Sequence, residues 1–487
     1  MNEATAPYRK WIYIGLLVQL IAAWFSVGYY HPDEHYQVLE FCNYRLGLSP
    51  LADLPWEYAA HCRGALQPCI VLFIAKVLQW MGAYNPFTVA LLLRLLMAVL
   101  TWYTISRLIK VLLPEFTTEK GRKLFVYASF LLWFVPYIGV RFSAETIAAD
   151  LFFIAITILL QVKNESGKTL QLLLAGLLLG FALFFRLQIG FAFIGLAIWL
   201  LGVQRTRFSH LLLLVVGGTA AIAVSVLVDR WFYGLWVFTP YNYFNVNIIQ
   251  HVAAKFGVDP WWYYFVLFFN MGIPPLSLVL LALFIWGIIK RPGHVLSLVC
   301  ITFIVGHFLI GHKEMRFLFP AMSAFIFVAS LGLDRFFQHV SQGGIYKWTL
   351  RVLIVMNIVL LVFKIFTPAE ELMKYYGFIY NYAQRQPTTI VAFNQSPYKL
   401  DVIECNFYKP SNLEIKTLQT PQQLQTLLAA NTGRTIIYLS RTLKPGAELA
   451  GFKTEQLYCE YPGWLLQFNV NNWEDRSYIW AVYKLSL

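Results

Sequence analysis

Long apolar runs dominate this sequence and restrict what it can fold into. Runs long enough to cross the roughly 30 Å hydrocarbon core of a bilayer occur near residues 11–30, 66–83, 86–106, 124–140, 147–162, 170–185, 189–203, 210–228, 263–289, 294–310, 317–333 and 352–366. The chain is 59% hydrophobic and only 13% charged, which a water-soluble globular domain does not tolerate. The sequence therefore predicts a polytopic α-helical membrane protein.

The distribution of basic residues predicts how these helices are oriented. Arg9 and Lys10 place the N-terminus inside, but strict alternation then puts the basic loop 107–123 outside, against the usual bias of such loops. Treating residues 64–83 as a juxtamembrane or re-entrant helix on the outer face removes the conflict, since a charged residue and Pro68 begin that run. About eleven transmembrane helices remain.

With this topology the unusual polar segments gather on one face. The outer side receives the first loop, residues 31–85, and everything after about residue 367. We expect a membrane domain over residues 1–366 and an extracytoplasmic or lumenal domain over residues 367–487. The active face is then non-cytosolic, at the plasma (inner) membrane of a prokaryote or the endoplasmic reticulum membrane of a eukaryote. The formal net charge of +13 comes from short loops that orient helices, so no nucleic-acid partner is expected.

The last 120 or so residues change character, because their apolar runs shrink to strand length. The predicted strands are Thr389–Phe393, Arg434–Leu439, Trp464–Val470 and Tyr478–Lys484. A helix between two of them begins with Thr420 as its N-cap and Pro421 at its first position. This pattern predicts a small α+β domain.

Two adjacent acids, Asp33 and Glu34, follow the first apolar run. Charges at the mouth of a membrane span are costly to desolvate and favour a working site over a pair of solvated headgroup-level acids. One carboxylate is suited to act on a substrate while its neighbour orients a partner. His31 and His35 lie four residues apart, but without further ligands at usable spacing we expect hydrogen bonding to substrate and no metal site.

The segment His312-Lys313-Glu314-Met315-Arg316 joins two apolar runs. Its cations suit a phosphate or pyrophosphate at the bilayer edge. An interfacial snorkelling loop is the alternative, and it explains Lys313 and Arg316 but not Glu314.

Three other charged residues, Arg141, Glu145 and Arg186, lie where helices reach the outer face. For these, packing ion pairs and ligand contacts are both consistent with the sequence. The aromatic and amide residues of 229–262 are typical of an interfacial aromatic belt more than of a sugar site. Two cysteine pairs, Cys42 with Cys62 and Cys405 with Cys459, each share a predicted outer segment and are candidates for disulfides in an oxidising compartment.

Taken together, these segments resemble glycosyltransferase family 22. The matching elements, in order, are His31-Pro32-Asp33-Glu34, Trp56-Glu57-Tyr58 with Arg63-Gly64 and Pro68, Arg141-Phe142-Ser143-Ala144-Glu145, Asp229 to Asn247 with Phe232-Tyr233-Gly234, Phe256-Gly257 with Pro260-Trp261, and His312 to Phe317. The sequence departs from the family pattern at Ser143-Ala144, where a longer polar string is common.

The resemblance implies a GT-C fold and an inverting, metal-independent transfer of mannose from a polyprenyl phosphate to a hydroxyl of a glycan or glycolipid acceptor. It implies no cofactor. Asp33 is the expected base and Glu34 the residue that binds or orients the acceptor. The expected donor-phosphate and substrate-binding residues are His312, Lys313, Glu314, Arg316, Arg141, His31, Arg186, Glu57 and Arg63.

Two alternatives remain at this point. A transporter or flippase for lipid-linked sugars would bind the same ligand without chemistry, but such proteins usually carry ionisable groups at mid-membrane and internal repeats. Another GT-C enzyme that transfers a different sugar shares the mechanism.

Overall fold

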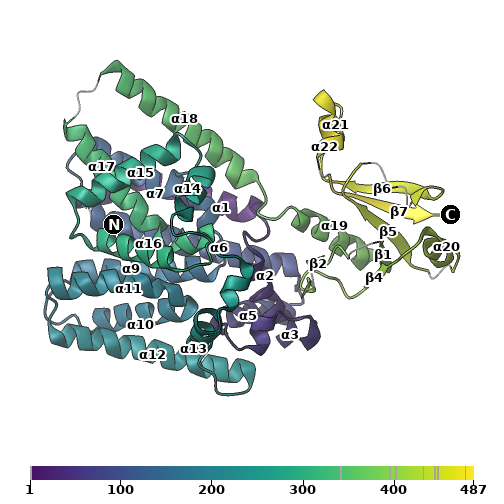
Figure 1. Ribbon diagram of the computed structural model, residues 1–487, viewed down its shortest axis with the longest axis horizontal. Coiled ribbons are helices and arrows are strands. Elements are labelled where there is room, and N and C mark those ends of the chain that lie inside the picture. Colours follow the sequence, from purple (N-terminus) through teal and green to yellow (C-terminus); the bar gives the residue numbers. More distant parts are fainter. Residues whose placement is uncertain are drawn as a thin grey trace. The chain divides into compact units, whose positions relative to one another are not determined.

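The computed structural model describes residues 3–339, 343–393, 396–400, 403–430, 433–443, 446, 449–477 and 479–487. The helices are α1 (Arg9–Phe25), α2 (Pro32–Tyr36), α3 (Leu39–Arg45), α4 (Trp56–Ala59), α5 (Leu66–Trp80), α6 (Pro86–Leu112), α7 (Glu119–Leu131), α8 (Val135–Gly139), α9 (Ala144–Val162), α10 (Thr169–Phe185), α11 (Gly190–Ile198), α12 (Phe208–Tyr233), α13 (Thr239–Phe244), α14 (Tyr263–Gly272), α15 (Leu276–Lys290), α16 (Val295–Leu309), α17 (Met322–His339), α18 (Gly344–Phe366), α19 (Leu372–Arg385), α20 (Pro421–Ala429), α21 (Gly463–Leu466) and α22 (Trp473–Arg476). The strands are β1 (Thr388–Ala392), β2 (Lys399–Leu400), β3 (Ile403–Glu404), β4 (Leu413–Thr417), β5 (Thr435–Ser440), β6 (Lys453–Cys459) and β7 (Ala481–Ser486). Figure 1 shows the ribbon coloured along the sequence, from purple at the N-terminus to yellow at the C-terminus.

The chain divides into two compact units. The first contains residues 1–26, 56–74 and 90–367, and the second contains residues 27–55, 75–89 and 368–487. The second unit thus includes residues 27–55, which the sequence assigns to the membrane domain. The acid pair therefore shares a unit with the C-terminal sheet.

Apolar helices form the first unit, as expected for a membrane protein. In the part of the chain that the structure describes, five helices are long and apolar enough to cross a bilayer, and five more apolar helices have 10–17 residues. The count of about eleven spans and the outer-face position of α5 stay predictions. The run expected over 263–289 is two helices, α14 and α15, because Pro274-Pro275 lies between them.

Small residues let some of these helices approach closely. A Cβ added to Gly176 of α10 would meet the Leu214 carbonyl oxygen of α12 at 2.2 Å, and one added to Gly217 of α12 would meet the Leu173 oxygen at 2.3 Å. Such contacts are the usual way in which helices associate in lipid, where the hydrophobic effect does not drive them together.

A mixed sheet organises the second unit, with strand order β4-β1-β5-β7-β6. Strand β1 pairs in parallel with β4 and β5, while β7 is antiparallel to both β5 and β6. Helix α20 packs on the sheet through Leu424, which shares a core with Val391 and Ile436. As predicted, Thr420 caps this helix by accepting the Gln423 N–H at 3.4 Å.

The C-terminal sheet differs from the prediction in two ways. Residues expected as the strand Trp464–Val470 instead begin as helix α21, after Pro462 and Gly463. The strands β4 and β6, which were not predicted, complete the sheet. The candidate disulfides Cys42–Cys62 and Cys405–Cys459 are not formed, since none of the six cysteines is in a disulfide.

Candidate functional site

The predicted acid pair lies in the short helix α2 of the second unit. The His31 side chain caps this helix, its Nδ1 accepting the Asp33 N–H at 3.2 Å, and Pro32 occupies the first position, where no backbone donor is needed. Glu34 Oε2 accepts the Tyr30 N–H at 3.4 Å. These local bonds hold the Asp33 backbone and the Glu34 carboxylate, and the Asp33 side chain keeps 26% of its surface exposed. A carboxylate in this position is accessible to a reactant.

The predicted phosphate motif, residues 312–316, lies in the first unit directly after α16. Lys313 Nζ donates to the carbonyl oxygens of His307 (3.4 Å), Phe308 (3.2 Å) and Ile310. These acceptors take the three N–H donors of an ammonium group. Burial lowers the pKa of Lys313 from its usual value. This lysine therefore terminates α16, a structural role that the motif alone did not indicate.

Glu314 organises the rest of the motif. Its carboxylate pairs with Arg316 through Nε and through Nη2 (3.1 Å), and His312 Nε2 lies 2.9 Å from its Oε1. This hydrogen bond to Glu314 raises the pKa of His312 above its usual value. Glu314, which a snorkelling loop did not explain, is thus the residue that fixes two neighbours.

A buried ion cluster joins this motif to two distant helices. Glu145, at the start of α9, lies 3.1 Å from Arg186 and 3.8 Å from Arg316, and all three side chains are nearly inaccessible. The Phe317 ring contacts both guanidinium groups, at 5.1 Å and 5.3 Å from its centroid. The structure therefore brings together Glu145, Arg186, Glu314 and Arg316, which the sequence placed only on a common face.

Arg141 has different partners. Its Nη2 donates to the carbonyl and hydroxyl oxygens of Ser26, each at 2.6 Å, and its Nε donates to the Tyr137 carbonyl at 3.2 Å. Ser26 ends α1. These contacts give Arg141 a packing role at the end of that helix.

Glu57 and Arg63 lie on the segment before α5. Glu57 is buried in α4, and its carbonyl oxygen accepts the Cys62 N–H at 3.3 Å. The Arg63 carbonyl accepts the Tyr233 hydroxyl at 2.6 Å, and its guanidinium lies 5.2 Å from the Tyr243 ring centroid. Arg63 is thus fixed against α12 and α13.

Asp229, a fully buried acid of α12, links the same segments. One carboxylate oxygen accepts the Ala65 N–H at 2.7 Å and the other accepts the Thr239 hydroxyl at 2.7 Å. It therefore holds the chain before α5 against the start of α13. A buried acid in an apolar helix was a usable signal in the sequence, although its position among the aromatic and amide residues of 229–262 favoured an aromatic belt.

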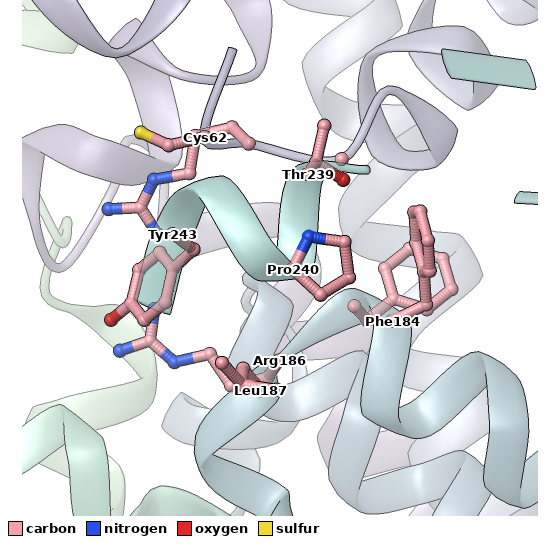
Figure 2. A pocket seen from close by; sticks show the side chains of 10 residues that line it. Cys62, Phe184, Arg186, Leu187, Thr239, Pro240 and Tyr243 are labelled. Carbon is pink, nitrogen blue, oxygen red and sulfur yellow. The ribbon is translucent and has the colours of Figure 1, made fainter. Parts of the chain in front are cut away.

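These segments line a small, partly open pocket of about 30 Å³ in the first unit. Its lining residues are Cys62, Arg63, Gly64, Phe184, Phe185, Arg186, Leu187, Thr239, Pro240 and Tyr243. In Figure 2 the side chains of Arg186 and Tyr243 point toward the same end of this pocket. Two arginines predicted from scattered motifs thus line one cavity with apolar and aromatic side chains, whereas Thr239, Pro240 and Tyr243 were not predicted.

Arg63 and Arg186 are the charged residues among those that line this pocket. Two acids contact the lining from behind, Glu145 paired with Arg186 and Asp229 with Thr239. Guanidinium groups in a partly desolvated site are well suited to oxygen anions such as phosphate.

Comparison with known proteins decides the family. The profile of the Alg9-like mannosyltransferase family matches residues 11–412. The chain belongs to this family. Its similar relatives include GPI mannosyltransferase 3 of Drosophila melanogaster, which is 25% identical over 71% of this chain and 60% of its own length. GPI alpha-1,2-mannosyltransferase 3 of Mus musculus is 27% identical over 60% of this chain and 52% of its own length. The matched region thus spans only about half to three fifths of these Alg9-like relatives.

Solved structures confirm the fold of this Alg9-like chain. ArnT from Cupriavidus metallidurans, determined with undecaprenyl phosphate, has a TM-score of 0.54 at 11% identity and covers 99% of this chain and 98% of its own. The archaeal oligosaccharyltransferase AglB from Archaeoglobus fulgidus, determined with an inhibitory peptide and a dolichol-phosphate, has a TM-score of 0.50 at 11% identity over 89% of this chain and 69% of its own. The protein is therefore an integral membrane protein with the GT-C fold, as predicted.

Proposed function

We propose that this chain is an inverting α-mannosyltransferase that transfers mannose from a polyprenyl phosphate to a hydroxyl of a glycan or glycolipid acceptor. The observation that carries the proposal is the pocket lined by Arg63 and Arg186 in a member of a mannosyltransferase family. The undecaprenyl phosphate and dolichol-phosphate named for ArnT and AglB support a lipid phosphate as the donor. The names of the GPI mannosyltransferase relatives support a glycolipid acceptor.

The donor phosphate binds beside Arg186 and Arg63, with Arg316 contributing positive charge. Departure of a lipid phosphate leaves negative charge on its oxygens, and preorganised guanidinium groups stabilise that charge in the transition state. Lys313 acts indirectly, because its donors hold the end of α16. His312 and Glu314 fix Arg316 and so position it.

The acceptor hydroxyl attacks the anomeric carbon from the face opposite the phosphate. Its proton passes to the Asp33 carboxylate as the new C–O bond forms and the bond to the phosphate oxygen breaks. Glu34 binds or orients the acceptor, and His31 fixes the backbone of Asp33. The transfer step itself uses no metal ion. The active face and the second unit are non-cytosolic, at an inner membrane or an endoplasmic reticulum membrane.

The test is transfer by the purified full chain in nanodiscs, with radiolabelled polyprenyl-phosphate mannose and a panel of mannosylated glycans and glycolipids. We expect labelled product and free polyprenyl phosphate in equal amounts, at a rate that EDTA does not change over the assay. Binding of the donor without release of mannose to any acceptor or to water contradicts the proposal and favours a carrier.

A further inference from the structure

A second polar cluster lies within the second unit. His35 Nε2 lies 2.8 Å from Glu40 Oε1 and 3.2 Å from Cys405 Sγ, and all three donor atoms lie within 4.8 Å of one another. The three residues are 0%, 1% and 3% exposed. Cys405 is 370 residues from His35 in the sequence, which is why the sequence revealed no third ligand.

The geometry excludes a nucleophilic triad. In such a triad the thiol and the carboxylate contact opposite nitrogens of the imidazole. Here both contact Nε2, while Nδ1 has no hydrogen-bond partner among the described residues. Nε2 carries either one proton or one lone pair. Hydrogen bonding alone therefore satisfies its two contacts, to the Glu40 carboxylate and the Cys405 thiol, poorly.

We propose that His35, Glu40 and Cys405 bind a Zn²⁺ ion. Imidazole, carboxylate and thiolate are the ligand types that zinc prefers, and water completes a tetrahedral site. Bonds of about 2.0–2.3 Å place tetrahedral ligand atoms roughly 3.3–3.6 Å apart. The imidazole and carboxylate therefore need to separate by only about half an ångström. Zinc binding displaces the thiol proton of Cys405.

The surroundings of the cluster resemble the shell that supports a metal site. The Phe407 N–H donates to Glu40 Oε1 at 2.8 Å, and the Ser49 hydroxyl donates to Glu40 Oε2 at 3.3 Å. The rings of Tyr408 and Tyr29 lie 5.5 Å and 5.6 Å from the His35 ring. Hydrogen bonds to a ligating carboxylate and an apolar wall are the features that orient ligands and strengthen binding.

The ion would fasten two distant parts of the same unit. Residues 405–407 each contact the 35–53 segment, with Asn406 Nδ2 donating to Asp53 Oδ2 at 2.8 Å. His35 follows Asp33 by two residues on α2. The zinc thus has a positioning role for the acid-bearing helix, and the site is independent of whether the chain transfers mannose.

Metal analysis of the purified full chain tests the proposal. After gel filtration in metal-free buffer we expect about one zinc ion per chain. The variants Cys405→Ser and Glu40→Gln should retain about tenfold less. Cys459→Ser is the matched control, because it removes a cysteine of the same unit that has no described metal-ligand cluster. Cobalt-substituted protein should show a thiolate-to-cobalt charge-transfer band that Cys405→Ser lacks.

Two outcomes overturn the proposal. One is wild-type protein that contains no zinc after incubation with equimolar ZnCl₂, which leaves a hydrogen-bonded network only. The other is a folded Cys405→Ser variant that keeps the metal. If that variant does not fold, the deciding measurement uses a chain that retains only Cys405 of its six cysteines. Absence of the cobalt charge-transfer band from this chain contradicts the site.

Discussion

The α2 acids and the 312–316 motif are both dense runs of charge beside apolar helices, yet they are held in different ways. Asp33 and Glu34 take their positions from bonds to residues within four positions in the sequence, and Asp33 stays partly exposed. By contrast, the charged groups of the 312–316 motif have partners within the protein. Lys313 donates to backbone carbonyls, Glu314 pairs with Arg316, and Arg316 also lies near Glu145 of α9. The comparison teaches that charge density alone does not identify the groups that bind a ligand.

The largest expected effect is at Asp33. Asp33→Asn should lower the rate of mannose transfer by about 10²–10⁴-fold, because an amide cannot accept the acceptor proton. Donor binding should change little. Initial rates and donor affinity in nanodiscs measure the two effects, with Glu455→Gln, an exposed acid on β6, as the control. Near-normal turnover of Asp33→Asn would show that Asp33 is not the base.

Arg186→Ala should come next. Losing a charge-assisted contact to phosphate costs about 1.5–3 kcal/mol, so we expect KM for the donor to rise by roughly 10- to 100-fold with a smaller change for the acceptor. Arg207→Ala removes an exposed arginine whose described side-chain hydrogen bond is to Ser166, and it should have no effect on KM. A defect confined to the acceptor would show that the pocket is not the phosphate site.

A substitution at Lys313 tests whether this residue of the 312–316 motif stabilises the fold or binds the donor. Lys313→Met keeps the aliphatic stem but leaves helix-terminal carbonyls without a donor, so it should destabilise the protein by about 1–2 kcal/mol. Its donor KM should rise less than that of Arg186→Ala. Thermal unfolding and donor titration give both numbers, and exposed Lys255→Met is the matched variant. A larger rise in donor KM for Lys313→Met than for Arg186→Ala would show that Lys313 binds the phosphate directly.

The smallest expected effect is a pH dependence at His312. Glu314 raises the pKa of this histidine in the folded state, so its stabilising contribution is present below the ordinary value of about 6.5. That contribution is lost as the pH rises through the folded pKa. The difference in free energy of unfolding between wild type and His312→Gln should be about 1 kcal/mol or less at pH 5.5 and should shrink by pH 8. Thermal unfolding of both proteins across this pH range measures it. A difference that grows with pH would contradict the pairing.

By itself the sequence determined the class of protein and most of its apolar helices, because apolar length and helix-capping patterns are local properties. The GT-C fold followed from the resemblance of its motifs to a known family. The sequence also singled out the acid pair Asp33 and Glu34, although it did not predict the short helix α2 that carries them. Where local rules failed, as at Trp464–Val470, the neighbouring Pro462 and Gly463 outweighed strand composition.

Tertiary structure alone decided which charges meet. Asp229 reaches Ala65 across 164 positions, Cys405 reaches His35 across 370, and Glu145, Arg186 and Arg316 come from three separate elements. The energy of a buried ion pair depends on the distance between the charged groups and on their desolvation in the folded protein. The spacing of residues along the chain determines neither quantity.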